Sequence, residues 1–213
     1  DRRKDQTYVL YVMTQEQLGY TLFPLGGLTK PEVRRVAERL ALPVAAKPES
    51  QEICFVPDND YAGFVREYTG IASKPGPILD RSGNILGEHR GITAYTIGQR
   101  KGLGLTSQIP LYVTAVDGEK NTITVGTKEE VYMTGLIASG LNWISVRKPE
   151  KPIRVRAKIR YLHRAAEATV TPCGDDEVQV IFKEPQMAIT PGQATVFYDG
   201  DTVIGGGTIL RAL

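Results

Sequence analysis

The sequence predicts an α+β chain that is mainly β, with a short helical N-terminal segment, a small β-rich central domain and a C-terminal β-barrel. Three observations support this prediction. Helical spacing and capping residues are confined to the first third of the chain. Short stretches rich in Val, Ile and Thr, separated by turn residues, fill the remainder. The 213 residues include 22 glycines and 13 prolines, which indicates many turns.

The N-terminal region is predicted to begin with an extended stretch over residues 7–13, followed by three short helices. The first two helices are preceded by a threonine with Gln or Glu three residues later, the pattern of a capping box. The third begins after an aspartate, and Gly70 ends it. The predicted capping residues are Thr14, Thr29 and Asp60.

The remainder is predicted to form hairpins and then a small barrel. Turn signals at Asp80–Gly83 and at Asp117–Gly118 indicate two hairpins, over residues 78–86 and 111–125. Residues 131–135 are expected to be a connection. Short, regularly spaced strands then indicate a barrel. The strand candidates are residues 141–146, 153–161, 165–171, 178–182, 195–198 and 202–210.

Composition excludes several classes of protein. Two cysteines in a chain of this length do not make a disulfide framework, so a reducing, cytoplasmic location is expected. No apolar run approaches membrane-spanning length, and no membrane partner is expected. His89 and His163 lack ligand spacing, so no metal site is expected. Cys173 lies at a predicted hairpin tip and has no assigned role.

Positive charge is concentrated in one segment although the formal net charge is only +2. Between Arg147 and Arg164 there are eight Lys or Arg residues and one acidic residue, Glu150. Within it, four cations alternate with apolar residues, which places them on one face of a strand: Arg154, Arg156, Lys158 and Arg160. Two interpretations remain open, a solvated barrel face and a surface for RNA phosphates.

Two glycine-rich segments are also ambiguous. Gly98–Gly104 contains Arg100 and Lys101 and could hold a phosphate through backbone N–H groups. It lacks the Gly-Lys-Ser/Thr ending of a P-loop, and its glycines are equally explained by positive φ angles. Gly205–Gly207 lies within a predicted strand and indicates a bulge or close packing.

Cys54 is the candidate for thiol chemistry. It lies in an apolar trio, typical of a core cysteine, but turn residues flank the trio, typical of an accessible thiol. Residues 50–55, Ser-Gln-Glu-Ile-Cys-Phe, resemble the second cysteine motif of the bacterial tRNA-specific 2-thiouridylases, the MnmA family. Further segments resemble that family in the same order, including residues 4–8, 23–26, 29–34, 95–103, 158–161, 185–186, 190–193 and 205–207.

The resemblance implies an organisation for the chain. Residues 1–59 would hold the end of a PP-loop α/β domain and the connection that carries the cysteine. Residues 60–130 would form the central β-rich domain. Residues 131–213 would form a barrel similar to the second domain of translation elongation factors. The phosphate loop of such enzymes is not among these residues, so the ATP site is expected in a preceding domain and this fragment alone is expected to be inactive.

The resemblance also implies a reaction. In the family, ATP adenylates the wobble uridine of tRNA, and a persulfide on the residue matching Cys54, loaded by a sulfur-relay protein, supplies the sulfur. Another cysteine, absent from this sequence, then forms a disulfide with it. The tRNA contacts carried over are Lys4, Asp5, Gln6, Arg160, Tyr161 and Gln193. Two other functions stay open: a stand-alone RNA-binding module without catalysis, and a barrel that binds protein partners.

Overall fold

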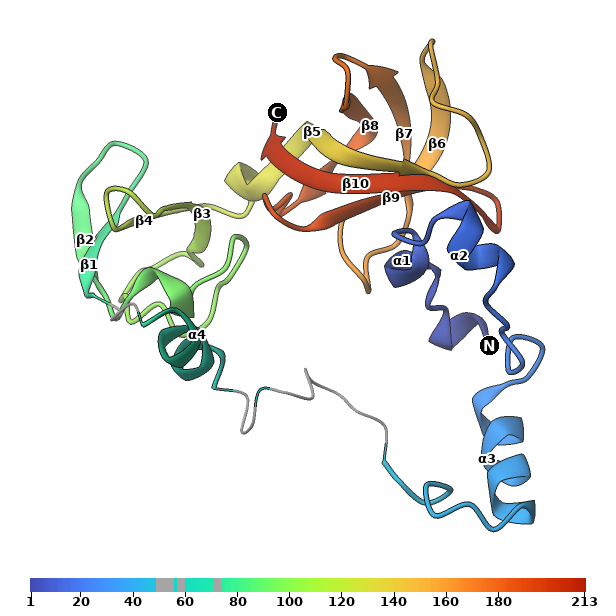
Figure 1. The fold of residues 1–213 in the computed structure, drawn as a ribbon. Coiled ribbons are helices and arrows are strands. Elements are labelled where there is room, and N and C mark those ends of the chain that lie inside the picture. The colour runs from blue at the N-terminus through green and yellow to red at the C-terminus, as the bar shows by residue number, and fades with distance from the viewer. Residues whose placement is uncertain (49–55, 57–59, 71–73) are drawn as a thin grey trace.

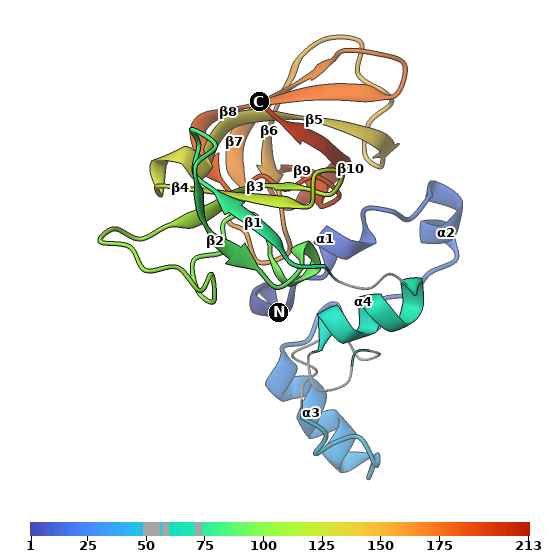
Figure 2. The same cartoon turned by 90° about the vertical axis from the view of Figure 1, so that its left-hand side faces the viewer.

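The computed structural model describes residues 1–48, 56, 60–70 and 74–213, and it has three parts (Figure 1). The first short helices of the chain lie against a closed β-barrel, and a small β-sheet lies on another side of the barrel. Figure 2 shows the small sheet in front of the barrel. Within the described residues, no helix combines the length and the apolar character needed to cross a membrane.

The helical elements lie mainly in the first 70 residues. In chain order they are η1 (Arg2–Lys4), α1 (Thr7–Leu10), α2 (Gln15–Gly19), α3 (Lys30–Arg39), α4 (Tyr61–Thr69), η3 (Ile92–Ala94) and η4 (Glu129–Val131). The small sheet contains β1 (Gly76–Leu79), β2 (Ile85–His89), β3 (Tyr112–Asp117) and β4 (Thr122–Gly126). The barrel contains β5 (Tyr132–Trp143), β6 (Ile153–Lys158), β7 (Ala166–Pro172), β8 (Glu177–Met187), β9 (Ala194–Asp199) and β10 (Thr202–Ala212).

The predicted helix caps are confirmed. The Thr14 hydroxyl accepts from the Gln17 backbone N–H at 3.2 Å, and the Thr14 N–H donates to the Gln17 side chain at 2.9 Å. At α3, the backbone N–H and the hydroxyl of Thr29 both donate to the Glu32 carboxylate. These two bonds lower the pKa of Glu32. Asp60 caps α4 with its side chain. Each cap satisfies backbone donors that a helix start leaves unpaired.

The prediction of an extended stretch over residues 7–13 is wrong, because residues 7–10 form α1. Thr7 donates from both its backbone N–H and its hydroxyl to the Asp5 carboxylate, which fixes the first turn. Tyr8 and Tyr11 are three residues apart and therefore lie on the same face of the turn. Both are buried with Val196 and Tyr198 of β9. Burial of two aromatic side chains against the barrel outweighs the local preference for extended backbone.

Hydrogen bonds hold this N-terminal segment on the barrel. The Tyr8 hydroxyl donates to the Ala194 carbonyl oxygen at 2.8 Å. Burial, with smaller contributions from the neighbouring tyrosines, raises the pKa of Tyr8 to about 12, so the phenol keeps its proton. The Asn142 side chain donates to the carbonyl oxygens of Tyr11 at 2.6 Å and Met13 at 2.9 Å.

The small sheet has the strand order β2-β1-β4-β3, with β1 parallel to β4 and the other pairs antiparallel. Both predicted hairpins are confirmed. His89, the last residue of β2, is buried, and its two ring nitrogens have partners. The backbone N–H of Gly91 donates to Nδ1 at 3.0 Å, so Nε2 carries the hydrogen that meets the Asn121 carbonyl oxygen at 2.9 Å. His89 is therefore a structural residue.

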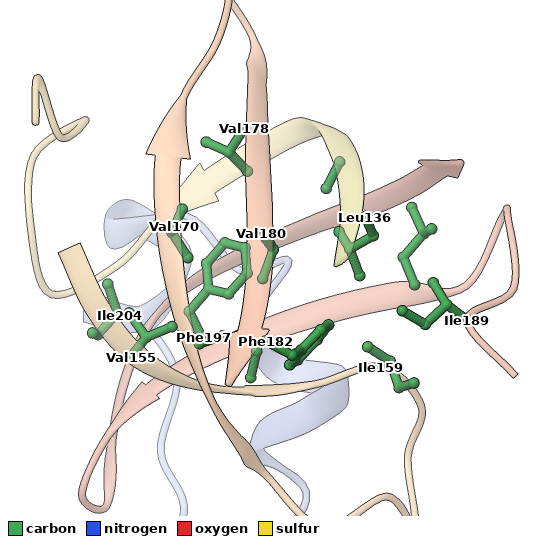
Figure 3. Close-up of a cluster of buried hydrophobic side chains, with 14 residues drawn as sticks. Leu136, Val155, Ile159, Val170, Val178, Val180, Phe182, Ile189, Phe197 and Ile204 are labelled. Atoms are coloured by element: carbon green, nitrogen blue, oxygen red, sulfur yellow. The ribbon is translucent and has the colours of Figure 1, made fainter. Parts of the chain in front are cut away.

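The barrel closes in the order β10-β5-β8-β7-β6-β9, and every strand pair in it is antiparallel. Its interior is filled by aliphatic side chains and two phenylalanines, Phe182 and Phe197 (Figure 3). The prediction of a connection at residues 131–135 is wrong, because β5 begins at Tyr132. The Thr134 N–H donates to the Leu213 carbonyl oxygen and the Leu213 N–H to that of Gly135, so this end of β5 pairs with the chain's last residue.

The Gly205–Gly207 segment is a close-packing site with bulges, as predicted. The register of β10 shifts between Val203 and Gly205 against β9, and between Gly206 and Thr208 against β5. A Cβ atom on any of the three glycines would lie within 2.7 Å of a backbone carbonyl oxygen. At Gly206 it would also lie 2.6 Å from the Tyr11 ring. The N-terminal segment can dock here only because β10 has no side chain at that point.

We expect Gly206→Ala to lower the free energy of unfolding by about 1–3 kcal/mol, the usual cost of overpacking. The added methyl group would push against the Thr195 carbonyl oxygen and the Tyr11 ring, neither of which can move without breaking the docking. Urea denaturation monitored by circular dichroism measures the change.

Gly19→Ala is the matched control, because no atom lies within 4 Å of its added Cβ atom and Gly19 is in helix α2. Alanine is the better helix former, so this variant should be at least as stable as the unaltered chain. Equal unfolding midpoints for Gly206→Ala and Gly19→Ala would contradict the packing argument.

Candidate nucleic-acid interface

The interface is built around the end of strand β6. Val155, Ala157 and Ile159 point into the barrel and are buried. The strand ends at Lys158, so Arg160 and Tyr161 lie beyond it, and both are exposed. On an ideal strand these two side chains would point to opposite faces. Because neither residue belongs to the strand, both side chains can lie on one surface.

Tyr161 contacts the N-terminal segment across 155 residues of sequence. The Gln6 side chain donates from Nε2 to the Tyr161 hydroxyl at 2.8 Å. The Tyr8 and Tyr161 ring centroids are 6.1 Å apart, with the rings inclined at 59°. One edge of the Tyr161 ring is therefore held, while 39% of the residue stays exposed to solvent.

Lys158, one of the four alternating cations, has two neighbouring side chains that interact with its charge. Its Nζ lies 3.9 Å from the Asp5 carboxylate and 5.3 Å from the centroid of the Tyr198 ring. The four alternating cations therefore do not form a row without counter-ions, because Lys158 has both an acidic and an aromatic partner. Arg156 also lies opposite Glu167 in the β6–β7 register. Glu167 pairs first with Lys183, at 2.9 Å, and that bond is the main reason its pKa is lowered.

Arg160 is anchored but keeps donors available. Its Nη1 donates to the Met187 carbonyl oxygen at 3.0 Å. A guanidinium carries five N–H donors, so this bond leaves others for an anion. Among the described residues, Arg160 forms no salt bridge with an acidic side chain. The exposed guanidinium is therefore suited to a phosphate.

Gln193 lies on the neighbouring barrel loop. Gly192, with a φ of 83°, forms a turn with the residues around it, and the Gln193 side chain is exposed. The carbonyl oxygen of the next residue, Ala194, accepts the hydrogen bond from Tyr8. Gln193 is thus next to the barrel residue that binds Tyr8, whose ring in turn contacts Tyr161.

His163 closes the turn after β6. Its backbone N–H donates to the Arg160 carbonyl oxygen at 3.0 Å. Burial of the ring, and then the positive charge of Arg160, lowers the pKa of His163, so the ring is uncharged at neutral pH. Its Nδ1 is buried and has no protein partner among the described residues. The ring contributes shape, not charge, to this surface.

Three other residues singled out in the sequence are Lys4, Cys54 and Cys173. Lys4 is exposed at the end of η1, one residue before Asp5. Cys54, predicted to lie on a short extended segment between turns, is outside the described residues. Cys173 is exposed between β7 and β8. In the described part of the chain, no cluster of three or more His, Cys, Asp or Glu side chains could hold a metal ion.

Sequence reasoning missed two residues that organise the interface, Tyr8 and Tyr198. Tyr8 positions Tyr161, and Tyr198 lies beneath Lys158. The spacing of Tyr8 and Tyr11 was an available signal, because aromatic residues three apart mark one face of a helical turn. No local signal marks Tyr198, which alternates with Phe197 in a strand where both faces are buried.

Three family models match successive parts of the chain. A "tRNA methyl transferase HUP domain" matches residues 1–58, a "tRNA methyl transferase PRC-barrel domain" matches residues 62–127, and an "Aminomethyltransferase beta-barrel domain" matches residues 133–209. The second match covers the small sheet and the third covers most of the closed barrel.

Curated relatives match along the whole chain. The tRNA-specific 2-thiouridylase MnmA of Symbiobacterium thermophilum is 56% identical over 213 residues, which is 100% of this chain and 55% of the relative. MnmA 1 of Caldanaerobacter subterraneus is 57% identical over 209 residues, 98% of this chain and 57% of the relative. MnmA of Acetivibrio thermocellus is 55% identical over 208 residues, 98% of this chain and 58% of the relative.

The chain thus spans somewhat more than half the length of these relatives. The three matched domains follow the same order as the helical segment, small sheet and barrel described above. On this evidence the chain belongs to the MnmA family of tRNA-specific 2-thiouridylases and is homologous to the C-terminal half of its members.

Proposed function

We propose that this chain supplies the tRNA-binding surface and the sulfur-carrying cysteine of a tRNA sulfurtransferase that makes 2-thiouridine at the wobble position. The observation that carries the proposal is a pair of contacts. Gln6 forms a hydrogen bond with Tyr161, and Asp5 forms an ion pair with Lys158. Two segments that are far apart in the sequence, and that both resemble tRNA-contacting segments, form one surface.

The chemistry of that surface suits a folded RNA. Arg160 offers charged N–H donors to phosphate oxygens, and the exposed part of the Tyr161 ring offers a face on which a base can stack. Lys4, which precedes Asp5, and Gln193, which precedes Ala194, would add a cation and an amide to the surface. Proteins recognise RNA largely through its backbone and its unstacked bases, and these groups can contact both.

Cys54 is the sulfur carrier in this proposal. A persulfide on a cysteine is a soft nucleophile that can be reloaded by sulfur transfer from a donor protein, whereas a serine hydroxyl cannot hold the extra sulfur atom. Cys173 has no such role, because it lies on the exposed β7–β8 connection, at the end of the barrel strands away from Arg160.

ATP enters the proposal through the family and not through the residues of this chain. The glycine-rich loop at residues 98–104 lacks the Gly-Lys-Ser/Thr ending that a P-loop needs. We therefore assign ATP binding to the part of the relatives' length that this chain does not span. The division at residues 1–59, 60–130 and 131–213 is kept as part of the proposal.

We expect Arg160→Ala to weaken tRNA binding and to flatten its salt dependence. Loss of one phosphate contact should reduce the slope of log affinity against log salt concentration by about 0.7–0.9. Tyr161→Leu should weaken binding by about 1–3 kcal/mol, the value of a base–aromatic stack, with little change in slope. Fluorescence anisotropy with a labelled tRNA transcript, measured across a salt series, separates the two effects.

Lys151→Gln is the matched control, since Lys151 is exposed and precedes β6, whereas Arg160 follows it. The control should bind like the unaltered chain. Melting curves for all variants exclude unfolding as the cause. If Arg160→Ala and Lys151→Gln have the same affinity and slope, the four alternating cations form a solvated barrel face and not a surface for RNA phosphates.

In an enzyme of full family length carrying these residues, Cys54→Ser should abolish thiolation, and Cys173→Ser should leave it unchanged. Mass spectrometry of nucleosides from the reacted tRNA measures the 2-thiouridine formed. Retained activity in the Cys54 variant would remove the sulfur-carrying role from Cys54.

The 213-residue chain by itself should neither hydrolyse ATP nor thiolate tRNA, because its sequence contains no Ser-Gly-Gly-x-Asp-Ser phosphate loop. Phosphate release and 2-thiouridine formation by the purified chain measure the two activities. Thiolation that depends on ATP would overturn the assignment of ATP binding to the rest of the enzyme.

A further inference from the structure

The Gly98–Gly104 segment, here called the basic loop, carries two cations that the proposed tRNA surface does not use. It belongs to the central domain, between η3 and β3, whereas Arg160 and Gln193 belong to the barrel. The basic loop is a candidate site for the same tRNA if its shape, its charge and its position all suit that ligand.

The backbone of the basic loop is fixed by its own hydrogen bonds. The Gly98 N–H donates to the Val113 carbonyl oxygen at 2.8 Å, and the Val113 N–H donates to that of Gln99 at 2.9 Å. The Gln99 side chain accepts from the Thr96 N–H and donates to the Lys101 carbonyl oxygen. Two bonds to a strand of the sheet and two bonds across the turn hold the loop in one conformation.

The side chains of Arg100 and Lys101 are not needed for that conformation. Both residues are exposed, and within the described residues neither side chain forms a salt bridge or a hydrogen bond. Residues 98–111 contain no Asp or Glu. Two adjacent cations without counter-ions repel each other, so they add no stability to the fold, and an anionic ligand would relieve the repulsion.

The position of the basic loop connects it to the barrel. A Cβ atom on Gly98 would lie 2.6 Å from the Ala188 Cβ atom, so the loop backbone packs directly on the barrel residue Ala188. The residue before it, Met187, accepts the hydrogen bond from Arg160. Ala188 itself donates to the Val131 carbonyl oxygen at 2.8 Å, which ties this barrel loop to the junction between the domains.

Arg160 and the basic loop therefore contact adjacent barrel residues, Met187 and Ala188. Arg100 is two residues from Gly98, a span of at most about 7 Å. An open hollow of about 500 Å³ lies beside Arg100 and extends to Pro110 and Leu111. The loop thus presents charge at the rim of a recess, next to the barrel loop that anchors Arg160.

We infer that Arg100 and Lys101 form a second phosphate-contact site for tRNA, so that the central domain and the barrel bind the same RNA backbone. This inference rests on the proposed function, because the shared ligand is the tRNA bound by Arg160. An RNA is favoured as the ligand because its backbone carries regularly spaced phosphates that can reach both domains at once.

The test compares Arg100→Gln/Lys101→Gln with Arg160→Ala and with the control Lys151→Gln. The probe is an in vitro transcript of a tRNA with uridine at the first anticodon position, bound to the 213-residue chain across a salt series. The double variant should bind more weakly, and its slope of log affinity against log salt concentration should be shallower by about 1.4–1.8. Its melting temperature should not fall, since neither side chain has a partner among the described residues.

The outcomes separate the two proposals. If Arg160→Ala weakens binding and the double variant behaves like Lys151→Gln, the basic loop is not a phosphate site and the proposed function stands. If the double variant weakens binding and Arg160→Ala does not, the loop site is supported and the barrel contact is wrong. If the unaltered chain does not bind the transcript at low salt, both are overturned.

Discussion

The docking of Tyr8 and Tyr11 on strand β9 is the interaction on which the candidate interface depends. It buries two aromatic rings against Val196 and Tyr198, and the hydrogen bonds from Tyr8 and Asn142 fix its orientation. Asp5 and Gln6 directly precede α1, so the docked helix determines where their side chains lie. Without it, neither the Asp5–Lys158 ion pair nor the Gln6–Tyr161 hydrogen bond could form.

The docking also explains two features of the barrel that have no role inside it. The absence of a side chain at Gly206 lets Tyr11 approach β10. The outward-facing residues of β9 are apolar, because the helical segment covers them. The barrel is therefore shaped on its outer face by the N-terminal segment as well as by its own core.

The features that could be predicted from the sequence are those set by neighbouring residues. The caps at Thr14, Thr29 and Asp60 depend on side chains three residues away, and the hairpins depend on short turns. Most barrel strands were found through their apolar residues. The strand predicted over residues 153–161 was too long, because β6 ends at Lys158 and leaves Arg160 and Tyr161 beyond it.

The features that could not be predicted depend on contacts between distant residues. The α1 turn forms because of β9, which lies about 190 residues later. Lys158 forms an ion pair with Asp5, and Thr134 and Gly135 near the start of β5 form hydrogen bonds with Leu213. Local propensity carries no information about such partners. The resemblance to a family supplied the candidate contact residues, but their arrangement comes from the fold.

The hydrogen bond from Gln6 to the Tyr161 hydroxyl has a consequence for the entropy of recognition. A free tyrosine that stacks on a base loses rotational freedom when it binds, at a cost of about 0.5–1.5 kcal/mol for each immobilised side chain. Here the ring is already restrained by Gln6 and Tyr8, so that loss occurs when the chain folds and not when a ligand arrives. A base that stacks on Tyr161 would meet a ring whose orientation is set in advance, by a residue at the other end of the chain.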